Sequence, residues 1–197
     1  MQALLRTLDR IALLSASDFK YDFNNPPSDA ITTGKGGHTV KADCKVFPAL
    51  IGTGVGMTVG FIGACGFNTP HTQPRSSEIN TVVEGRLGTE SIAKNGVDQI
   101  RNMLEKYQMT VFPQGAAHTE FNPDCEPAVF VAGFASEDPG VEQAAQTLFG
   151  FDAELVEADL GVQSINGASI EDFRKVITAN VALGVEQCLR KCGISKK

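Results

Sequence analysis

The stretch from Gly66 to Gly85, with the sequence GFNTPHTQPRSSEINTVVEG, constrains the fold of this chain more than any other. Successive side chains of a strand point to opposite faces, so His71 and Gln73 lie on one face. Pro74 interrupts the strand pattern, and a proline in that position indicates a bend or an edge. We expect the bend to bring Glu78 back to the same face. The stretch therefore predicts two strands that aim three polar side chains at one point.

A second stretch, Phe112–Asn122 with the sequence FPQGAAHTEFN, adds another imidazole. It is His118, which follows a Pro-x-Gly turn. Two imidazoles, a carboxylate and an amide oxygen held by strands are a suitable ligand set for a divalent metal. The two stretches together therefore predict a metal site with the ligands His71, Gln73, Glu78 and His118.

Short apolar runs separated by turns continue the strand pattern through the middle of the chain. These runs are Met57–Ile62, Ile79–Val83, Met109–Phe112 and Ala128–Phe134. Short strands at regular spacing predict an antiparallel sandwich or barrel. The intervening residues 97–106 fit either a helical turn or an irregular hairpin arm.

The length of the chain indicates one domain. At 197 residues it can bury one good core and is short for two. We expect an N-terminal arm over about residues 1–18, a β-barrel over about 19–136 and a helical segment over about 137–197. The helical segment is expected to begin with a short helix over Val141–Leu148.

Both ends of the chain carry helix signals. The stretch Ala3–Leu14 predicts an amphipathic helix or an arm that packs on a partner surface, and its charged residues exclude the apolar core of a secretion signal. Near the C-terminus, Ser169 fits an N-cap with Asp172 three residues later, as in a capping box. Apolar residues then repeat on one helical face as far as Leu189, and Gly193 is placed to end the helix. This pattern predicts one long C-terminal helix.

The charge balance narrows the classes of partner. A net charge of −6 argues against nucleic acid or an anionic membrane surface as the partner. No apolar run reaches the ~18 residues that a transmembrane helix needs. We therefore expect neither nucleic acid nor a membrane as a partner.

The two polar stretches resemble the two motifs of the cupin superfamily. In the first motif, His71, Glu78 and Gly85 stand at the family's spacing. The second motif is matched by Pro113, Gly115, His118 and Asn122. The resemblance implies a mostly β fold, the cupin antiparallel β-barrel or jelly roll.

The chain departs from the family motifs at three positions. The second histidine of the first motif is Gln73 here, and the first glycines of the two motifs are replaced by Cys65 and Tyr107. The glycine changes alter turns and leave the ligands alone. The glutamine changes the chemistry, because its carbonyl oxygen is a neutral and weaker ligand than imidazole.

Within the superfamily, the chain is similar to the germin group, and there to the spherulin-type germin-like proteins of fungi and slime moulds. The similarity includes the segments NTPHTQPRSSEI, FASEDPG and TLFG, and extends from about Phe19 to the C-terminal helix. It implies C-terminal α-helices that clasp a neighbouring subunit, and hence a homodimer or a larger homo-oligomer. It also implies secretion, while an intracellular form stays open.

In germins, three histidines and one glutamate bind Mn²⁺ for chemistry on oxalate or superoxide. The resemblance thus implies a divalent metal here, Mn²⁺ ahead of Fe, Cu or Ni, and an oxidoreductase with His71, Glu78 and His118 as catalytic residues. Because Gln73 weakens the ligand set, a second hypothesis is a cupin with little or no metal that works as an isomerase or cyclase, in which Asn68 and Gln73 bind the substrate. A third hypothesis is a non-catalytic stress or wall protein.

The five cysteines cannot all pair with one another. Cys188 and Cys192 are one helical turn apart, which is poor geometry for a disulfide and places both on one face. Cys65 precedes the first ligand and Cys125 follows the last, so we expect a Cys65–Cys125 bridge. Cys44 would then meet a helix cysteine or stay free. A metal role for the thiols is not expected, because C-x-x-C spacing is missing.

Overall fold

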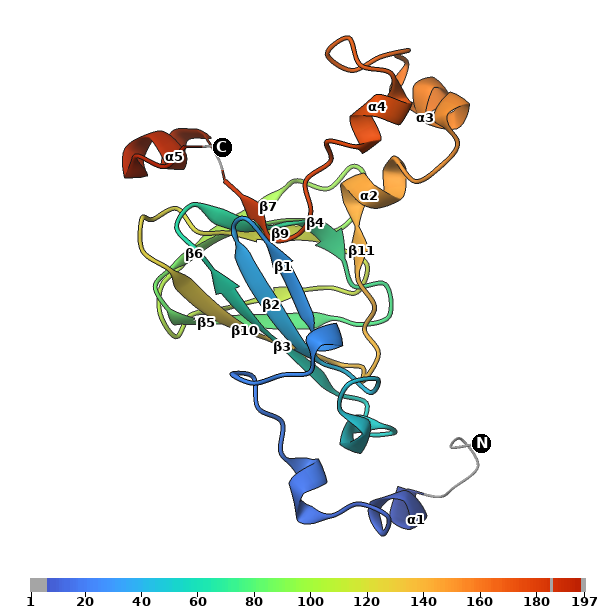
Figure 1. The fold of residues 1–197 in the computed structure, drawn as a ribbon, viewed down its shortest axis with the longest axis vertical. Coiled ribbons are helices and arrows are strands. Elements are labelled where there is room, and N and C mark those ends of the chain that lie inside the picture. The colour runs from blue at the N-terminus through green and yellow to red at the C-terminus, as the bar shows by residue number, and fades with distance from the viewer. Residues whose placement is uncertain (1–6, 185, 196–197) are drawn as a thin grey trace.

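A computed structural model describes residues 7–184 and 186–195 of the chain, which build two antiparallel β-sheets (Figure 1). In the first sheet the strands lie in the order β1 (Ile31–Gly34), β2 (Gly37–Ala42), β3 (Gly56–Ile62), β10 (Ala128–Phe134), β5 (Glu78–Glu84) and β8 (Met109–Phe112). In the second sheet they lie in the order β11 (Glu142–Gln143), β4 (Gly66–Thr72), β9 (Ala117–Phe121), β6 (Leu87–Ile92) and β7 (Ile100–Leu104), and β12 (Ala182–Leu183) also pairs with β4. The mostly β fold with C-terminal helices that the sequence predicts is confirmed.

The helices lie at the two ends of the sequence. They are α1 (Thr7–Ile11), α2 (Ala144–Leu148), α3 (Ala153–Leu160), α4 (Ile170–Arg174) and α5 (Glu186–Cys192). Short 3-10 turns cover Ala16–Phe19, Ser28–Ala30 and Pro48–Leu50. Figure 1 shows α2, α3 and α4 together beyond one end of the barrel, and α5 apart from them.

Alternation of side chains produces the barrel interior. On β5 the side chains of Glu78, Asn80 and Val82 are buried, and Ile79 between them is half exposed. The same alternation on β10 buries Phe130, which packs in the main core. That core is made of Ile62, Val82, Leu87, Leu104, Ala128, Phe130, Ala132, Phe134 and Val181. Apolar side chains thus fill one part of the interior, and polar residues of the same strands face another.

The four apolar runs of the sequence become β3, β5, β8 and β10. Residues 97–106 form a hairpin arm and not a helical turn, because β7 pairs with β6 from Leu87 opposite Leu104 to Ser91 opposite Ile100. The short helix expected over Val141–Leu148 begins only at Ala144, since the two preceding residues pair with β4 as β11.

The prediction of one long C-terminal helix is wrong. Ser169 does cap a helix, accepting a hydrogen bond from the Asp172 amide at 3.2 Å, but α4 ends after five residues at Arg174. The chain then inserts Val181 into the barrel core and pairs β12 with β4 before α5 begins. Burial of that side chain and the strand pairing override the helical periodicity. Gly193, with a φ of 65°, follows α5 as expected of a helix terminator.

The helix expected over Ala3–Leu14 is observed in part, as α1 and a turn after it. Residues 3–6 of that prediction lie outside the described residues. Among the residues that the structure describes, no helix combines the length and the apolar character needed to cross a membrane.

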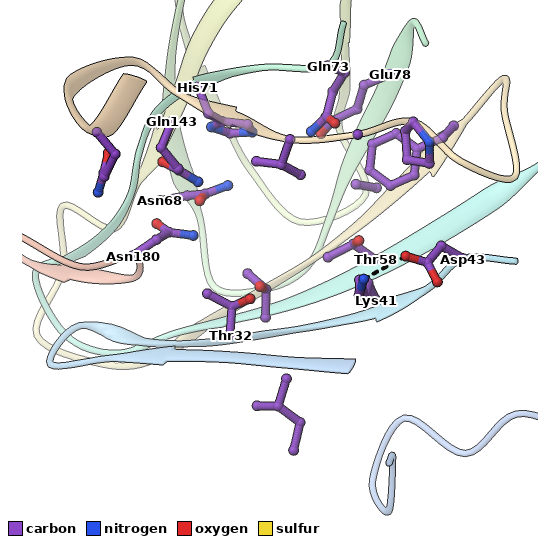
Figure 2. Close-up of a pocket in the computed structure, with 18 of the residues that line it drawn as sticks. Thr32, Lys41, Asp43, Thr58, Asn68, His71, Gln73, Glu78, Gln143 and Asn180 are labelled. Atoms are coloured by element: carbon purple, nitrogen blue, oxygen red, sulfur yellow. Dashed lines mark hydrogen bonds and ion pairs between the residues drawn. The ribbon is translucent and has the colours of Figure 1, made fainter. Parts of the chain in front are cut away.

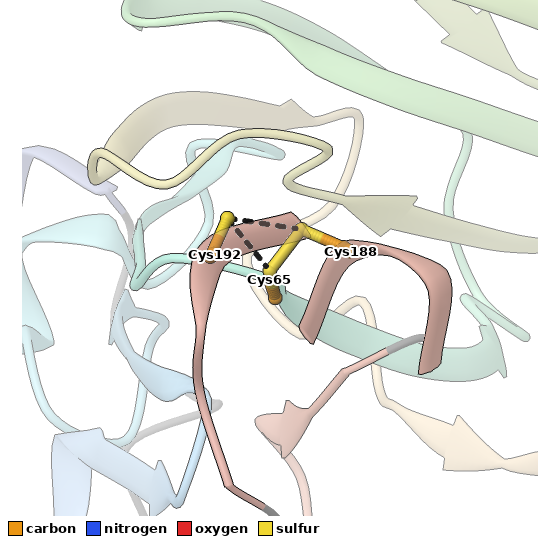
Figure 3. A group of neighbouring side chains, drawn as sticks. All are labelled: Cys65, Cys188 and Cys192. Atoms are coloured by element: carbon orange, nitrogen blue, oxygen red, sulfur yellow. Dashed lines mark hydrogen bonds between the residues drawn. A yellow bond between two sulfur atoms is a disulfide. The ribbon is translucent and has the colours of Figure 1, made fainter. Parts of the chain in front are cut away.

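The predicted Cys65–Cys125 bridge is also wrong. The disulfides are Cys65–Cys188 and Cys125–Cys192, with Cα–Cα distances of 5.6 and 5.4 Å. Figure 3 shows Cys188 of α5 bonded to Cys65, with Cys192 beside them. Cys192 bonds to Cys125, so each cysteine of α5 meets a barrel cysteine. Cys44 is free of a disulfide. The two bridges fasten the C-terminal helix to one end of the barrel.

Candidate metal centre

Three strands bring the candidate ligands together. His71 on β4 lies directly opposite His118 on β9 in the antiparallel register, and Glu78 is the first residue of β5. One imidazole nitrogen of each histidine and one carboxylate oxygen of Glu78 all lie within 4.8 Å of one another. All three side chains are buried, so the barrel holds them away from bulk water.

Backbone carbonyls fix both imidazole rings. Nδ1 of His71 lies 2.9 Å from the carbonyl oxygen of Thr69, and Nδ1 of His118 lies 2.8 Å from that of Ala116. A carbonyl can only accept, so each Nδ1 carries the proton and donates it. This leaves Nε2 as the ligand atom of each ring, the arrangement in which protein histidines commonly bind metals.

The pKa values of the two histidines are shifted in opposite directions. Burial, and then the charge of His118, lower the pKa of His71 to about 4. Burial also acts to lower the pKa of His118, but the hydrogen bond to Glu78 and the charge of Glu120 outweigh it and raise that pKa above its ordinary value. Nε2 of His118 lies 3.2 Å from Oε2 of Glu78. His71 is therefore the neutral imidazole of the pair at physiological pH, ready to act as a ligand.

Gln73 directly follows β4, and its side chain lies beside the carboxylate of Glu78. Its amide nitrogen lies 3.4 Å from Oε2 of Glu78. Its amide oxygen is buried and has no hydrogen-bond partner among the described residues. A buried oxygen without a partner is unfavourable unless a ligand or water satisfies it. The donor set of two imidazoles, a carboxylate and an amide oxygen fits a divalent ion.

A second buried carboxylate lies behind the ligands. The Nδ2 atoms of Asn68 and Asn80 donate to Glu120 at 2.9 and 3.0 Å, and Nδ2 of Asn80 also lies 3.1 Å from Oε1 of Glu78. Burial, and then the charge of Glu78, raise the pKa of Glu120. This network ties the two carboxylates together through Asn80. The amide nitrogen of Asn68 thus donates to Glu120, whereas the sequence analysis expected Asn68 to bind the substrate.

Residues 22–164 match the family described as Cupin. The chain belongs to the cupin family. It is 45% identical to Spherulin-1A of Physarum polycephalum over 188 residues, which cover 95% of this chain and 75% of the relative. It is 36% identical to Germin-like protein 8-2 of Oryza sativa subsp. japonica over 140 residues, which cover 69% of this chain and 62% of the relative.

A solved structure of an oxalate oxidase has the same fold, with a TM-score of 0.66 and 24% identity over 82% of this chain and 77% of that one. At this level of identity the likeness concerns the fold. Together with the sequence relatives, it confirms that the chain is a cupin of the germin and spherulin type.

A cavity of about 1080 Å³ opens beside the ligands of this cupin. Figure 2 shows His71, Gln73 and Glu78 at one wall, and Thr32, Lys41, Asp43 and Thr58 farther away. Apolar side chains of Met57, Phe130 and Phe134 also line the cavity. The space accommodates a molecule with an apolar body.

Some residues of the cupin interior were missed by reasoning from sequence. Glu120 stands two residues after His118 on a strand, so the alternation of side chains was a signal that could have found it. Asn122, the last residue of the second motif, is buried and donates to the carbonyls of Ile62, Gly63 and Glu126, which fixes the loop after β9 and not a ligand. Gln143 and Asn180 also line the cavity, and no local sequence signal marked them.

Proposed function

We propose that this cupin binds a divalent metal ion through His71, Glu78 and His118, with the amide oxygen of Gln73 as a fourth ligand. The bound ion serves redox chemistry on a small organic molecule held in the cavity. The observation that carries the proposal is the convergence of three buried ligand atoms within 4.8 Å, each on its own strand. Side chains that meet in this way are the kind of preorganised set that a metal site requires.

The chemistry of the donors favours Mn²⁺ or Fe²⁺. Two imidazoles and one carboxylate are the ligands of many redox-active iron sites with open positions, and oxygen ligands suit manganese. The amide oxygen of Gln73 adds a neutral oxygen donor in place of an imidazole. Manganese is the first choice, because the relatives of this chain include germin-like proteins.

Each residue of the site has a task in this proposal. A bound redox-active ion supplies the electron-transfer step to or from the substrate. The carbonyls of Thr69 and Ala116 hold the two imidazoles in the ligating tautomer. Asn80 orients the Glu78 carboxylate, and the apolar side chains of the cavity limit the access of water.

The test compares metal-loaded protein with protein stripped by a chelator. Oxygen uptake with oxalate, and superoxide removal, are measured after loading with Mn²⁺ or Fe²⁺. We expect activity that depends on the added ion and is lost in Glu78→Gln, which keeps the shape of the ligand and removes its charge. A protein that fills with metal and turns over neither compound would contradict the redox part of the proposal. Equal activity in stripped protein would contradict the metal part.

One observation favours a second candidate, a non-redox isomerase or cyclase. The Glu78 carboxylate already has three neighbours within the protein, since Gln73 and Asn80 donate toward it and Nε2 of His118 does so when that imidazole is protonated. A carboxylate that is satisfied in this way does not need a metal, and its contact with His118 is a ready acid–base pair. Protein that stays empty when metal is supplied would favour this candidate.

Three broader expectations belong to the proposal. We infer one domain, because the family match and the barrel cover most of the chain. We infer secretion, supported by two disulfides, which persist in oxidising compartments. We infer a homodimer or larger assembly from the resemblance to germins. Gel filtration with light scattering tests the assembly, and a monomer in dilute solution would contradict it.

A further inference from the structure

Thr69 on β4 links the candidate metal centre to a different part of the chain. Its carbonyl oxygen holds Nδ1 of His71 at 2.9 Å. Its backbone amide donates to Oδ1 of Asn180 at 2.9 Å, and its hydroxyl donates to Oε1 of Gln143. One buried threonine therefore fixes a metal ligand on one side and two amide side chains on the other.

These contacts determine which way the two amides face. A backbone N–H can only donate, so the oxygen of Asn180 must face Thr69 and its NH₂ group must point away. In the structure the oxygen of Gln143 accepts from the Thr69 hydroxyl, which also lies 3.3 Å from Oδ1 of Asn180. Neither amide nitrogen has a hydrogen-bond partner among the described residues, and both residues line the cavity. The protein thus leaves two NH₂ donors unused at one wall.

The two donors lie next to the candidate metal centre. Gln143 on β11 is the cross-strand partner of His71 on β4. Asn180 reaches the same strand two residues away, through Thr69. Figure 2 shows the amides of Gln143, Asn180 and Asn68 grouped below His71 on one wall of the cavity. A molecule that approaches the ligands from the cavity passes these donors.

We propose that Gln143 and Asn180 are specificity-determining residues whose NH₂ groups bind one oxygen acceptor, a carboxylate or a carbonyl, of the molecule in the cavity. The proposal rests on the proposed function for the role of the cavity as the substrate site, and it names the substrate class. An NH₂ group donates and cannot accept, so the ligand must carry the acceptor. A ligand without an acceptor leaves both donors unpaired and is rejected.

The apolar wall completes the description of the ligand. Met57, Phe130 and Phe134 line the same cavity as the two amides, and its volume of about 1080 Å³ exceeds what a small diacid fills. The structure therefore fits a molecule with an apolar body and at least one oxygen acceptor.

Three probes that share one aromatic ring test this directly. They are benzoate, an anionic acceptor; acetophenone, a neutral acceptor; and benzylamine, which is protonated at neutral pH and only donates. Binding is measured by calorimetry on metal-stripped protein, so that no probe can bind through a metal. We expect benzoate, acetophenone or both to bind, and benzylamine not to bind. Binding of benzoate alone identifies a carboxylate substrate, and binding of both identifies a carbonyl as sufficient.

Two isosteric variants examine the donors. Asn180→Asp and Gln143→Glu keep the oxygen that accepts from Thr69 and replace each NH₂ with an oxygen. We expect each to weaken acceptor binding about tenfold or more, the scale of one lost hydrogen bond with added repulsion. Benzylamine should gain binding in both variants, which an unfolded protein could not show. Gln108→Glu is the charge-matched control, because this residue is exposed, does not line the cavity, and keeps the oxygen that accepts from the Glu105 amide at 2.9 Å.

The outcomes separate this proposal from the metal proposal. Unchanged acceptor binding in both isosteric variants would contradict the proposal that Gln143 and Asn180 bind the ligand. The absence of acceptor binding by folded wild-type protein would contradict it too. Metal affinity is measured separately on the same preparations. If the protein takes up no metal and the variants still lose acceptor binding, the metal site is refuted. The role of Gln143 and Asn180 as donors to the ligand is then supported.

Discussion

The strands β4, β5 and β9 carry the candidate metal ligands, and the C-terminal segment (residues 137–184 and 186–195) lines the cavity beside them, but different contacts hold the two regions in place. The strands belong to continuous antiparallel ladders, and β5 contributes Val82 to the main apolar core, which Val181 of the C-terminal segment also joins. The C-terminal segment forms two-residue strands on β4 and has a small apolar cluster of its own around Phe149, Val156 and Ile170. Its last helix is fastened by two disulfides.

The two regions contribute different residues to the site. The rigid strands carry the candidate metal ligands, whose positions must be accurate to a fraction of an ångström. The C-terminal segment carries Gln143 and Asn180, which line the cavity. Metal binding should therefore depend on the strands alone, and ligand selection on the C-terminal segment. The predictions below examine that division, from the largest expected effect to the smallest.

Loss of a strand ligand should have the largest effect. We expect His118→Ala to weaken Mn²⁺ binding by more than about 100-fold, because even changes behind the ligands reach that scale. Calorimetric titration of stripped protein measures it. The matched control is His38→Ala, on β2, whose ring stacks on Phe61 with centroids 4.6 Å apart. Equal affinities in the two variants would contradict the assignment of His118 as a ligand.

Removal of a disulfide that fastens the C-terminal segment should lower stability without changing the metal ligands. We expect the paired substitution of Cys65 and Cys188 by serine to lower the free energy of unfolding by about 2–5 kcal/mol, because the bridge closes a long loop. Denaturant unfolding measures it, with Cys44→Ser as the control, since Cys44 forms no disulfide. Mn²⁺ affinity should stay as in the wild type. A parallel loss of metal affinity would show that the two regions are not independent.

The next largest effect should come from replacing Gln73 with histidine, which restores an imidazole to the ligand set. We expect Gln73→His to raise Mn²⁺ affinity about tenfold, or about 1.4 kcal/mol, because imidazole is the stronger ligand. The control Gln114→His adds a histidine at an exposed position whose amide donates to the Pro74 carbonyl. If Gln73→His left affinity unchanged, Gln73 would not be part of the ligand set.

The smallest effect concerns the ion pairs between the barrel and α5. Asp124 contacts Arg86 at 2.6 Å and Lys191 of α5 at 3.3 Å, and the hydrogen bond from Arg86 is the main cause that lowers the pKa of Asp124 to about 2. The folded pKa lies below its ordinary value of 3.8. The stabilisation is therefore present above pH 3.8 and is lost as the pH falls through about 2.

Thermal unfolding of Asp124→Asn between neutral pH and pH 2 measures this linkage. The variant should melt slightly below the wild type at neutral pH, and the difference should shrink as the wild-type carboxyl takes up its proton. Asp159→Asn, exposed on α3, controls for the loss of one negative charge. A difference that stays constant across the range would contradict the role of the ionised Asp124.

The same two regions differ in how far the sequence predicts them. The alternation of β5 is a local pattern, so the burial of Glu78 beside exposed Ile79 could be predicted from the order of the residues. The meeting of His71 with His118 depends on pairing between distant strands, which local alternation cannot show; the ligand chemistry of the two stretches and their resemblance to the cupin motifs predicted it. Glu120 obeys the same local rule as Glu78 and could have been predicted.

The C-terminal segment escaped prediction because its conformation depends on distant partners. The periodicity from Phe173 to Leu189 is helical, yet Val181 is buried in the barrel core, and burial of apolar surface is the main driving force of folding. The cysteine pairing follows from where α5 packs, which spacing cannot show. The contact that holds Asn180 at the cavity is with the backbone amide of Thr69, which is far away in the sequence.

Metal content per chain tests the central claim most directly. The protein is purified without chelator or a metal-affinity column, and its metals are quantified by mass spectrometry before and after incubation with Mn²⁺ or Fe²⁺. The account predicts about one divalent ion per chain, in keeping with one set of ligands. Protein that stays empty after incubation with both ions would contradict it.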